Sequence, residues 1–432
     1  MTDSFESIDA DVIVVGAGPA GIAAAVRAAD GGQRVVLVDE SPNTGGQIWR
    51  HRPGAPMPAA ARRWLARVER SGARVFVGTS VVDAYGDADA GFVLVAERQG
   101  RPLTLRAKRL MLATGARERF LPFPGWTLPG VVGVGGAQAL LKAGMTVAGT
   151  SVVIAGSGPL LLPVAASLRA AGARVALVAE QAPAGRVASF VAGLWRRPAA
   201  LLDAARYRAG FARTPYRLGW WVLEARGTHV VREVVLTDGR VTRVVRCDLL
   251  CTGYGLVPNT ELARLLGCAT DGGVVVVDDE QRTSVRGVWC AGEPTGIGGV
   301  ELALVEGEIA GLSAADALAR EGRALLARRA RLRRLAASMA RAFALRAELR
   351  DAVTNETIIC RCEDVAFGAV RAEWSPRQAK LYTRAGMGPC QGRVCGPALS
   401  FLCGWPSDTV RAPVAPVVLA SALGASAPAA RR

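Results

Sequence analysis

The chain is poor in the residues that usually carry acid–base chemistry. Its 432 residues include only two histidines, His51 and His229, and no pair of carboxylates stands out as a general acid and base. Lysine is almost as scarce, with Lys108, Lys142 and Lys380, so the net charge of +16 comes almost entirely from arginine. Together with 50 Gly, this composition is typical of codon bias. We therefore expect no nucleic-acid partner.

Long apolar runs are also missing. No stretch reaches the ~20 apolar residues that a membrane-spanning helix needs. The chain begins with the acidic segment MTDSFESIDAD, where a secretory signal would be basic and then apolar. We therefore expect a cytoplasmic protein without a transmembrane segment, with peripheral attachment to the inner membrane as a variant. At 50% hydrophobic and 21% charged residues, the chain can bury the cores of two to four domains of about 100 to 200 residues.

A close pair of cysteines is absent from the chain before residue 390. No C-x-x-C or C-x4-C spacing occurs there, and Cys247, Cys251 and Cys290 lie in or beside apolar segments, where cysteine acts as a small buried apolar residue. This excludes a reductase that uses a dithiol beside its cofactor. Nine cysteines in a long intracellular chain favour metal or redox use of those that cluster.

The start of the chain carries a dinucleotide-binding pattern. Residues 12–15 (VIVV) predict a buried strand, and Gly16, Gly18 and Gly21 follow in G-x-G-x-x-G spacing before an Ala-rich helix. These glycines permit a tight turn, the approach of a pyrophosphate and close packing of the helix, whose N-terminus faces the phosphates. A second predicted strand ends at Asp39, where an acid accepts hydrogen bonds from ribose hydroxyls.

Three later segments favour FAD over NAD: a second glycine turn in NTGGQIW and two apolar strands that end in Thr-Gly and Gly-Glu. Their candidate cofactor-binding residues are Gly45, Gly46, Gln47, Thr114, Gly115, Gly292 and Glu293. This order resembles the flavoproteins of the thioredoxin reductase and glutathione reductase superfamily over residues 10–318. The resemblance implies an α/β fold with two Rossmann-like dinucleotide-binding domains and bound FAD. Glu293 stands where those proteins carry an Asp that binds the ribityl chain, so its longer side chain implies a shifted or water-mediated contact.

Residues 150–180 repeat the strand, turn, helix and strand plan, with Gly156 and Gly158 in the turn and an acid at Glu180. The third glycine is replaced by Leu161. We expect the helix to stand further from its strand or to tilt, which moves the positive dipole end that would hold a pyrophosphate. Three alternatives stay open for this second fold: NAD(P)H as a substrate, another nucleotide such as ATP, and a fold that binds no nucleotide.

A strongly basic segment follows these two folds. Residues 320–350 contain ten Arg and two Glu, with apolar residues near helical spacing. Three interpretations stay open: a solvated linker helix on the body of the protein, a helix that docks an acidic partner, and a helix on an anionic membrane surface. The predicted parts are an FAD-binding domain at 1–120 and 246–318, a second dinucleotide-binding-like domain at 121–245, a basic helical linker at 319–350, a cysteine-cluster domain at 351–411 and a flexible tail at 412–432.

Four cysteines near the end of the chain form the pattern C-x-C-x27-C-x4-C. They are Cys360, Cys362, Cys390 and Cys395. Four thiolates suit either a [2Fe–2S] cluster or a structural zinc, and the nearby glycines suit loops that direct N–H groups at cluster sulfurs. The segments CRCEDV and TRAGMGPCQGRVCG closely resemble the [2Fe–2S] domain of the bacterioferritin-associated ferredoxin type, although the spacer is a few residues shorter than usual there. The resemblance implies a [2Fe–2S] cluster on these four cysteines.

The combination of these parts resembles the large flavin subunit found in opine oxidase, hydrogen cyanide synthase, and the D-hydroxyproline and dye-linked L-proline dehydrogenases, over residues 10–411. It implies an electron-transferring FAD and [2Fe–2S] subunit of an amine or imino-acid dehydrogenase or oxidase, with no catalytic residue of its own assigned. The implied partners are a β subunit similar to D-amino-acid oxidases, a respiratory-chain or dye acceptor and a small third subunit, with FMN between subunits as a further cofactor. Two alternatives stay open: an NAD(P)H-dependent flavin and iron–sulfur reductase, and a zinc-stabilised flavoprotein scaffold.

Overall fold

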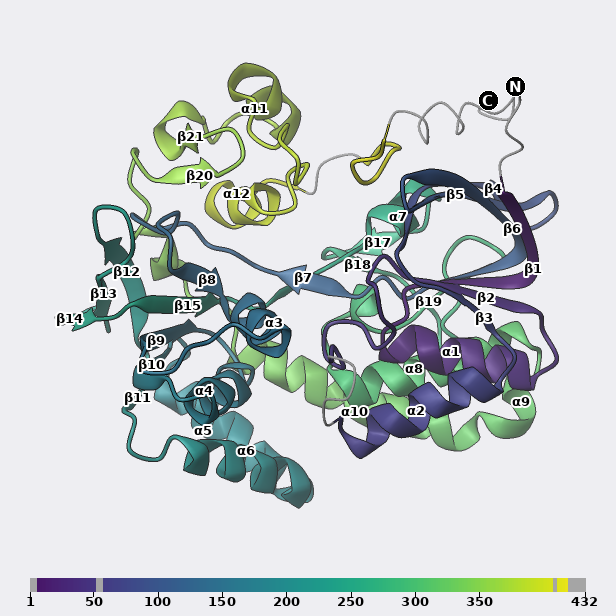
Figure 1. Ribbon diagram of the computed structural model, residues 1–432, viewed down its shortest axis with the longest axis horizontal. Coiled ribbons are helices and arrows are strands. Elements are labelled where there is room, and N and C mark those ends of the chain that lie inside the picture. Colours follow the sequence, from purple (N-terminus) through teal and green to yellow (C-terminus); the bar gives the residue numbers. More distant parts are fainter. Residues whose placement is uncertain (1–5, 52–56, 407–409, 419–432) are drawn as a thin grey trace. The chain divides into compact units, whose positions relative to one another are not determined.

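The computed structural model describes residues 6–51, 57–406 and 410–418 (Figure 1). The chain divides into unit 1, formed by residues 1–117, 258–336 and 409–432, and unit 2, formed by residues 118–257 and 337–408. It passes between them at the paired strands β7 (Ala116–Glu118) and β16 (Leu256–Pro258) and within helix α10. Unit 2 thus also contains the cysteine-rich segment. Of the predicted flexible tail, the part from residue 419 lies outside the described residues.

Unit 1 is built on a seven-stranded sheet in the order β3-β2-β1-β6-β5-β4, with β19 also paired to β6. The central strand β1 runs parallel to β2 and β6, whereas β4, β5 and β6 are antiparallel neighbours. The strands are β1 (Glu6–Val15), β2 (Val35–Val38), β3 (Arg74–Phe76), β4 (Thr79–Asp87), β5 (Gly91–Arg98), β6 (Arg101–Leu112) and β19 (Val288–Cys290). A small hairpin of β17 (Thr270–Asp271) and β18 (Val274–Val275) lies outside this sheet.

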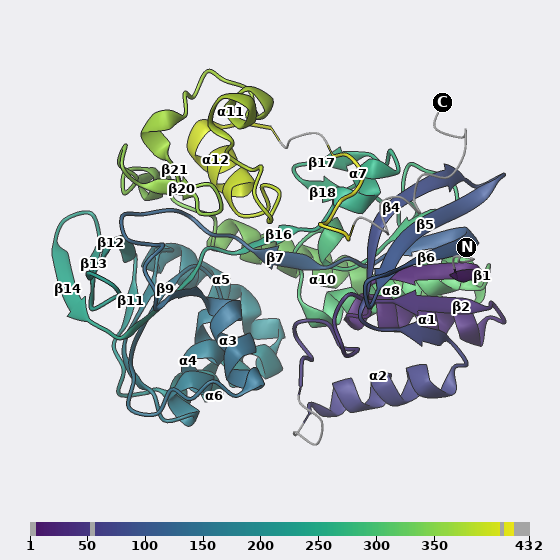
Figure 2. The same ribbon diagram turned by 45° about the horizontal axis from the view of Figure 1, so that its top comes forward.

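Alternate residues of β1 point to opposite faces of this sheet. Val12 and Val14 belong to an apolar cluster with α1, α2 and α8, which lie on one side of the sheet in Figures 1 and 2. Ile13 and Val15 belong to a second cluster on the other face, which includes α7. These helices are α1 (Pro19–Asp30), α2 (Ala59–Arg70), α7 (Glu261–Leu265) and α8 (Val300–Ala314). Burial on both faces explains why β2 and residues 12–15 of β1 form continuous apolar runs.

Helices α1 and α8 approach each other closely because α8 carries glycine at the contact. A Cβ atom on Gly307 would lie 2.1 Å from the carbonyl oxygen of Ala20, and one on Gly311 would lie 2.4 Å from that of Ala24. Real Cβ atoms do not come that close to a backbone oxygen. The two glycines therefore fix the distance between the helix that follows the first glycine turn and the helix that follows Gly292.

Unit 2 contains a five-stranded parallel sheet in the order β11-β10-β9-β15-β8. Helices α3 and α4 cover one face, with α6 packed on α4, and an antiparallel sheet of β12, β13 and β14 covers the other. A tight turn at Asp238 and Gly239 joins β13 to β14 in an antiparallel hairpin. The elements are β8 (Val131–Gly133), α3 (Val134–Ala143), β9 (Ser151–Gly156), α4 (Leu161–Ala170), β10 (Arg174–Glu180), α5 (Ala184–Gly193), α6 (Pro198–Gly210), β11 (Tyr216–Leu218), β12 (Trp221–Arg226), β13 (Glu233–Thr237), β14 (Thr242–Arg246) and β15 (Leu249–Gly253).

The cysteine-rich part of unit 2 has its own small apolar core, which includes Ile359, Leu399 and Trp405. Helix α11 begins with a capping box in which the side chains of Ser375 and Gln378 each bind the other residue's backbone N–H. Its elements are β20 (Ile358–Cys360), β21 (Val365–Ala366), α11 (Pro376–Thr383) and α12 (Cys395–Cys403).

The basic linker predicted over 319–350 is helical over α9 (Leu318–Glu321) and α10 (Arg323–Ala342), but residues 343–346 are not helical. Leu332 of α10 is buried and packs, with Leu325, against leucine and isoleucine side chains of α8 in unit 1. This packing agrees with the interpretation of a linker helix on the body of the protein. Among the helices that the described residues form, none is long and apolar enough to cross a membrane.

A buried carboxylate joins α8 to α10. Glu306 is fully buried and accepts hydrogen bonds from the Gly292 N–H at 3.0 Å and the Thr295 hydroxyl at 2.9 Å. Its other oxygen lies 2.7 Å from the Arg333 guanidinium and 3.9 Å from that of Arg329. Removing one partner of a buried ion pair is costly, because it leaves a charge without compensation.

We expect Glu306→Ala to lower the free energy of unfolding of unit 1 by about 3 kcal/mol, because Arg333 and the Gly292 and Thr295 donors lose their acceptor. Urea titration of the purified protein measures this loss. Asp30→Ala is the control: in the Asp30–Arg67 pair of 3.1 Å the Asp30 side chain is half exposed, so its removal should cost under about 1 kcal/mol. Equal losses in the two variants would contradict the structural role of Glu306.

Candidate functional site

The first glycine turn lies between β1 and α1. Gly16 has φ +103°, and a Cβ atom there would lie 2.2 Å from the carbonyl oxygen of Ala113. A Cβ atom on Gly21 would lie 1.7 Å from the carbonyl oxygen of Gly16. At Gly18, which caps α1, a Cβ atom would meet only the Cα atom of Gly46, at 4.0 Å. The protein backbone thus requires Gly16 and Gly21, whereas Gly18 leaves open space at the N-terminus of α1.

The second glycine turn packs directly on the first. The Gly45 N–H donates to the carbonyl oxygen of Ala17 at 2.8 Å, and a Cβ atom on Gly46 would lie 2.9 Å from the Cα atom of Gly18. Both glycines have positive φ, of +114° and +59°. Gln47 follows with an exposed side chain. The structure therefore brings the NTGGQIW segment to the N-terminus of α1.

Asp39 lies directly after β2 and is half-buried. One carboxylate oxygen accepts the N–H of Ala17 at 2.6 Å, and the other accepts the N–H of Ser41 at 2.8 Å. The carboxylate thus supports the first glycine turn from the end of the neighbouring strand. This is where the acid of a dinucleotide-binding fold meets the ribose.

The predicted Thr-Gly strand end is held by Asn259, a residue that sequence reasoning did not single out. The Thr114 hydroxyl donates to the carbonyl oxygen of Asn259 at 2.6 Å, and the Asn259 side-chain amide donates to that of Thr114 at 2.9 Å. The Asn259 N–H donates to Gly115 at 3.0 Å. The available signal was an amide residue directly after Pro258, where the chain returns to unit 1.

Gly292 and Glu293 also meet α1. A Cβ atom on Gly292, which has φ +80°, would lie 2.8 Å from the Cβ atom of Ala20. The Glu293 carboxylate accepts the N–H groups of Gly299 at 3.0 Å and Gly298 at 3.2 Å. Burial raises the pKa of Glu293, while these two hydrogen bonds oppose the rise. The side chain thus holds the glycine loop before α8, and its contact with a ribityl chain stays a prediction.

The glycine turn of unit 2, at Gly156 and Gly158, is built differently. Helix α1 begins at Pro19, directly after Gly18, whereas α4 begins at Leu161, so that Pro159 and Leu160 separate it from Gly158. The Gly158 N–H donates to Glu180 at 2.7 Å. The Glu180 carboxylate also accepts the N–H of Ala182 at 2.8 Å and is fully buried. Burial raises the pKa of Glu180 to about 7.

The four cysteines of the C-terminal pattern lie together in unit 2. Cys362 is a close neighbour of Cys390, and Cys395 is a close neighbour of Cys360. Each pair therefore combines one cysteine of the C-x-C segment with one of the C-x4-C segment. Cys360 and Cys395 are buried, and Cys362 is exposed. Among the described residues, no group of three or more His, Cys, Asp or Glu side chains is placed to hold a single metal ion.

Glycines let the second cysteine loop close over the first. A Cβ atom on Gly388 would lie 2.3 Å from the Cβ atom of Cys362, and the Gly386 N–H donates to the Cys360 sulfur at 3.5 Å. Gly386 and Gly392 have φ of +84° and +79°. Gly396 has no neighbour within 4 Å of a Cβ position, so packing does not require glycine there. Two thiol pairs with an N–H donor at sulfur fit a [2Fe–2S] cluster, which takes four thiolates.

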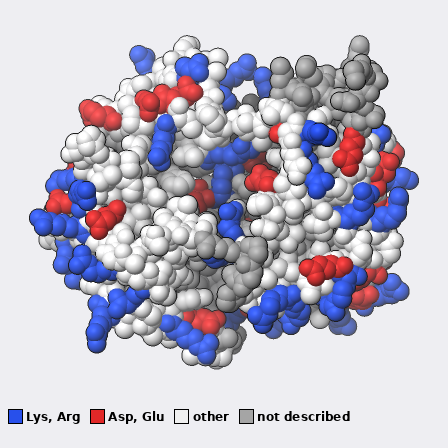
Figure 3. Space-filling view, viewed as in Figure 1, with Lys and Arg blue, Asp and Glu red and all other residues white. Residues whose placement is uncertain are grey.

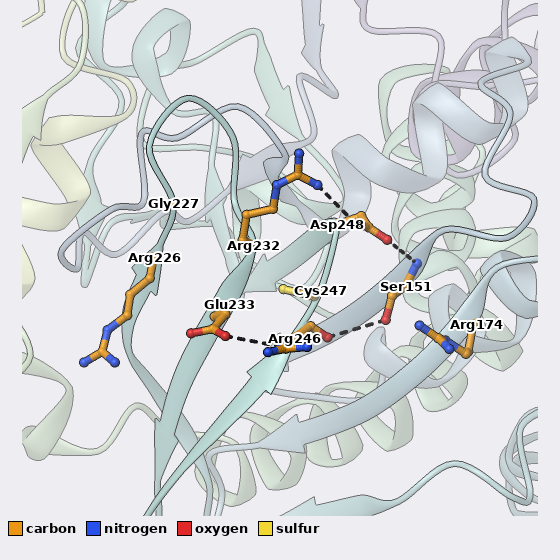
Figure 4. A pocket seen from close by; sticks show the side chains of 9 residues that line it. All are labelled: Ser151, Arg174, Arg226, Gly227, Arg232, Glu233, Arg246, Cys247 and Asp248. Atoms are coloured by element: carbon orange, nitrogen blue, oxygen red, sulfur yellow. Dashed lines mark hydrogen bonds and ion pairs between the residues drawn. The ribbon is translucent and has the colours of Figure 1, made fainter.

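A separate basic cavity of about 480 Å³ lies at the other end of β9, where Ser151 begins that strand. Its arginines stand beside acids: Arg232 lies 3.7 Å from Asp248, and Arg246 lies 3.6 Å from Glu233 (Figure 4). Arginine, lysine and acidic side chains are also interspersed over the face shown in Figure 3. The cavity is lined by Ser151, Arg174, Arg226, Gly227, Arg232, Glu233, Arg246, Cys247 and Asp248.

Comparison with known proteins identifies a family and finds similar chains and solved structures. The family model described as pyridine nucleotide-disulphide oxidoreductase matches residues 10–308. The HcnB chain of hydrogen cyanide synthase from Pseudomonas aeruginosa is 35% identical, over 89% of this chain and 90% of that protein. The A subunit of opine oxidase from Rhizobium meliloti is 35% identical, over 95% of this chain and 97% of that protein. The crystal structure of L-proline dehydrogenase from P. horikoshii has a TM-score of 0.69 and 19% identity, over 97% of this chain and 80% of that chain.

We expect Gly18→Ala to weaken FAD binding at least about tenfold, because its Cβ atom would stand in the space that a pyrophosphate needs. The protein itself has room for this atom, so the free energy of unfolding should fall by under about 1 kcal/mol. Flavin absorbance after dialysis and urea titration measure the two effects.

Two other glycine variants serve as comparisons for this test. Gly21→Ala should lower stability by about 2 kcal/mol or more, because its Cβ atom overlaps the Gly16 carbonyl. Gly185→Ala, on α5 with no neighbour within 4 Å, should leave FAD content unchanged. An unchanged FAD affinity in Gly18→Ala would contradict the placement of the pyrophosphate at Gly18.

Proposed function

Because the chain belongs to the pyridine nucleotide-disulphide oxidoreductase family, a family of FAD-dependent oxidoreductases, we propose that it is the electron-transferring flavin and iron–sulfur subunit of a heteromeric amine or imino-acid dehydrogenase or oxidase. The observation that carries this proposal is that one chain holds both a candidate FAD site and a candidate iron–sulfur site. Unit 1 holds the glycine and acid site at α1, and unit 2 holds two cysteine pairs.

The residues of unit 1 would hold FAD in a defined orientation. The open space at Gly18, in front of the N-terminus of α1, suits the pyrophosphate. Asp39 would accept from ribose hydroxyls, and the strand ends at Thr114 and at Gly292 would line the flavin side. FAD, when bound, takes up two electrons as a hydride and releases them one at a time.

The residues of unit 2 would hold a [2Fe–2S] cluster, which when bound carries one electron. Its ligands would be Cys360, Cys362, Cys390 and Cys395. The Gly386 N–H, which donates to the Cys360 sulfur, would stabilise negative charge on that thiolate. The exposed Cys362 leaves one edge of the site at the surface, where a redox partner can approach.

The two curated relatives support a heteromer, because their names mark both as subunits of an oxidase or synthase. The proposed partners are a β subunit similar to D-amino-acid oxidases, which would oxidise the substrate, and a small third subunit. An FMN between subunits and a respiratory-chain or dye acceptor complete this proposal. The scarcity of histidine on this chain supports a division of labour in which proton abstraction from the amine occurs elsewhere.

Metal analysis tests the cluster. Protein purified without oxygen should contain two irons and two acid-labile sulfides per chain and give a paramagnetic signal on reduction. Cys360→Ser should lose at least half of the iron, because a ligand is missing, whereas Cys403→Ser on the same α12 helix as Cys395 should keep it. Zinc without sulfide would support the scaffold alternative instead.

A donor assay tests the role of the chain within a heteromer. Co-purification with the product of a neighbouring gene, followed by a screen of opines, imino acids and glycine with a dye acceptor, should yield dye reduction that the isolated chain does not give. Rapid bleaching of the flavin in the isolated chain by NADH, without oxygen, would favour the alternative of an NAD(P)H-dependent reductase. Dye reduction by the isolated chain with an amine would contradict the need for a partner.

A further inference from the structure

Four residues after α10 cross the glycine turn of unit 2. We call Phe343, Ala344, Leu345 and Arg346 the strap. The Ser157 hydroxyl donates to the carbonyl oxygen of Phe343 at 2.9 Å. The Gln181 side-chain amide donates to that of Ala344 at 3.2 Å, and its oxygen accepts the N–H of Arg346 at 3.1 Å. The strap is thus bound along its length by two side chains.

These two side chains occupy the ligand-binding edge of the fold. Ser157 lies between Gly156 and Gly158 at the carboxyl end of β9, and Gln181 lies directly after β10. In open α/β folds the nucleotide binds in the crevice at the carboxyl ends of the strands, over the glycine turn and beside the acid of the next strand. The strap therefore runs where a dinucleotide would lie.

Side-chain packing fixes both ends of the strap. The Phe343 ring lies 4.0 Å from the Cβ position of Gly158 and makes an edge contact with Phe190 at 5.5 Å between ring centroids. The Arg346 guanidinium lies 3.8 Å from the ring centroid of Trp221 and donates to the carbonyl oxygen of Gly219 at 3.3 Å. A cation over an indole face is attracted by the ring quadrupole.

The polar groups that a nucleotide would use are already paired. Gln181 is fully buried and also donates to the Ser157 hydroxyl at 2.8 Å. Glu180, the predicted ribose acid, is equally buried and accepts two backbone N–H groups. In unit 1 the matching residues are more open, since Gly18 and Asp39 are both partly exposed. A nucleotide could enter unit 2 only by breaking the strap's hydrogen bonds and leaving buried polar groups unpaired.

We propose that the strap is a built-in occupant of the second dinucleotide-binding-like fold, so that unit 2 binds neither NAD(P)H nor a free adenine nucleotide. The fold then serves as a structural support on which the cysteine-rich part of the chain packs. The residues after the strap support this role: Leu349 is buried with Trp221 and Tyr254, and Arg350 donates to the carbonyl oxygen of Phe401 at 2.9 Å. The proposal goes beyond the proposed function and holds whichever molecule supplies electrons.

Equilibrium dialysis against NADH and ATP tests the occupant. The FAD-loaded full chain is used, so that the site in unit 1 is filled. We expect no saturable binding up to about 1 mM of either nucleotide, which corresponds to a dissociation constant weaker than about 1 mM. Saturable binding in the micromolar range, with protection of residues 157–158 and 180–181 from hydrogen exchange, would overturn the proposal.

Hydrogen exchange tests the strap itself, independently of activity. In Gln181→Leu the Arg346 N–H loses its acceptor, and we expect its exchange to accelerate at least about tenfold. The control is Thr214→Val, which removes a buried hydroxyl that donates to Val175 in the same fold and should leave the strap unchanged.

A second variant keeps the test decisive where Gln181→Leu folds poorly. Ser157→Ala removes only the hydroxyl that joins Gln181 to Phe343, and exchange at residues 343–346 should still accelerate by a few-fold. If amide hydrogen exchange at residues 343–346 is unchanged in the folded variants, these hydrogen bonds do not hold the strap and the proposal is wrong.

Discussion

The close approach of backbone segments at the start of α1 is the constraint on which unit 1 depends. Gly16 lies against Ala113, Gly46 against Gly18, and Gly292 and Gly307 against Ala20. At each of these contacts a Cβ atom on the first-named glycine would lie within 2.9 Å of the neighbouring residue, so the glycine can carry no side chain. A helix N-terminus with its N–H groups and dipole aimed at an open space results from this arrangement. The same packing that defines the fold therefore also defines the candidate cofactor site.

The second fold shows what changes when one of these contacts is lost. With Leu161 in place of the third glycine, α4 starts later, and Leu161 enters the apolar core of that fold instead of allowing a close helix. Glu180 then turns its carboxylate to the backbone of Gly158 and Ala182. One sequence plan thus gives an open site in unit 1 and a closed crevice in unit 2.

Much of this architecture could be predicted from local patterns. The strands, the glycine turns, the hairpin at Gly239 and the linker helix all follow from periodicity and turn residues over short windows. The residues that were missed act over long sequence distances. Asn259 binds a strand end 145 positions away, and Gln181 binds the strap 165 positions away. Glu306 was hidden for another reason: an acid within an apolar helix has no local signal that says which buried donors it satisfies.

The strap also bears on how electrons could reach the chain. Many flavoproteins with two dinucleotide-binding domains are reduced by NAD(P)H bound in the second domain. If the second fold of this chain is closed, electrons would have to reach unit 1 from a donor other than NAD(P)H. The scarcity of histidine and the absence of a dithiol before Cys390 point in the same direction, because neither amine deprotonation nor disulfide exchange has its usual groups on this chain. The chain keeps the flavin fold, uses the second fold as a structural support and adds four cysteines. This combination suits a protein that receives electrons and passes them on.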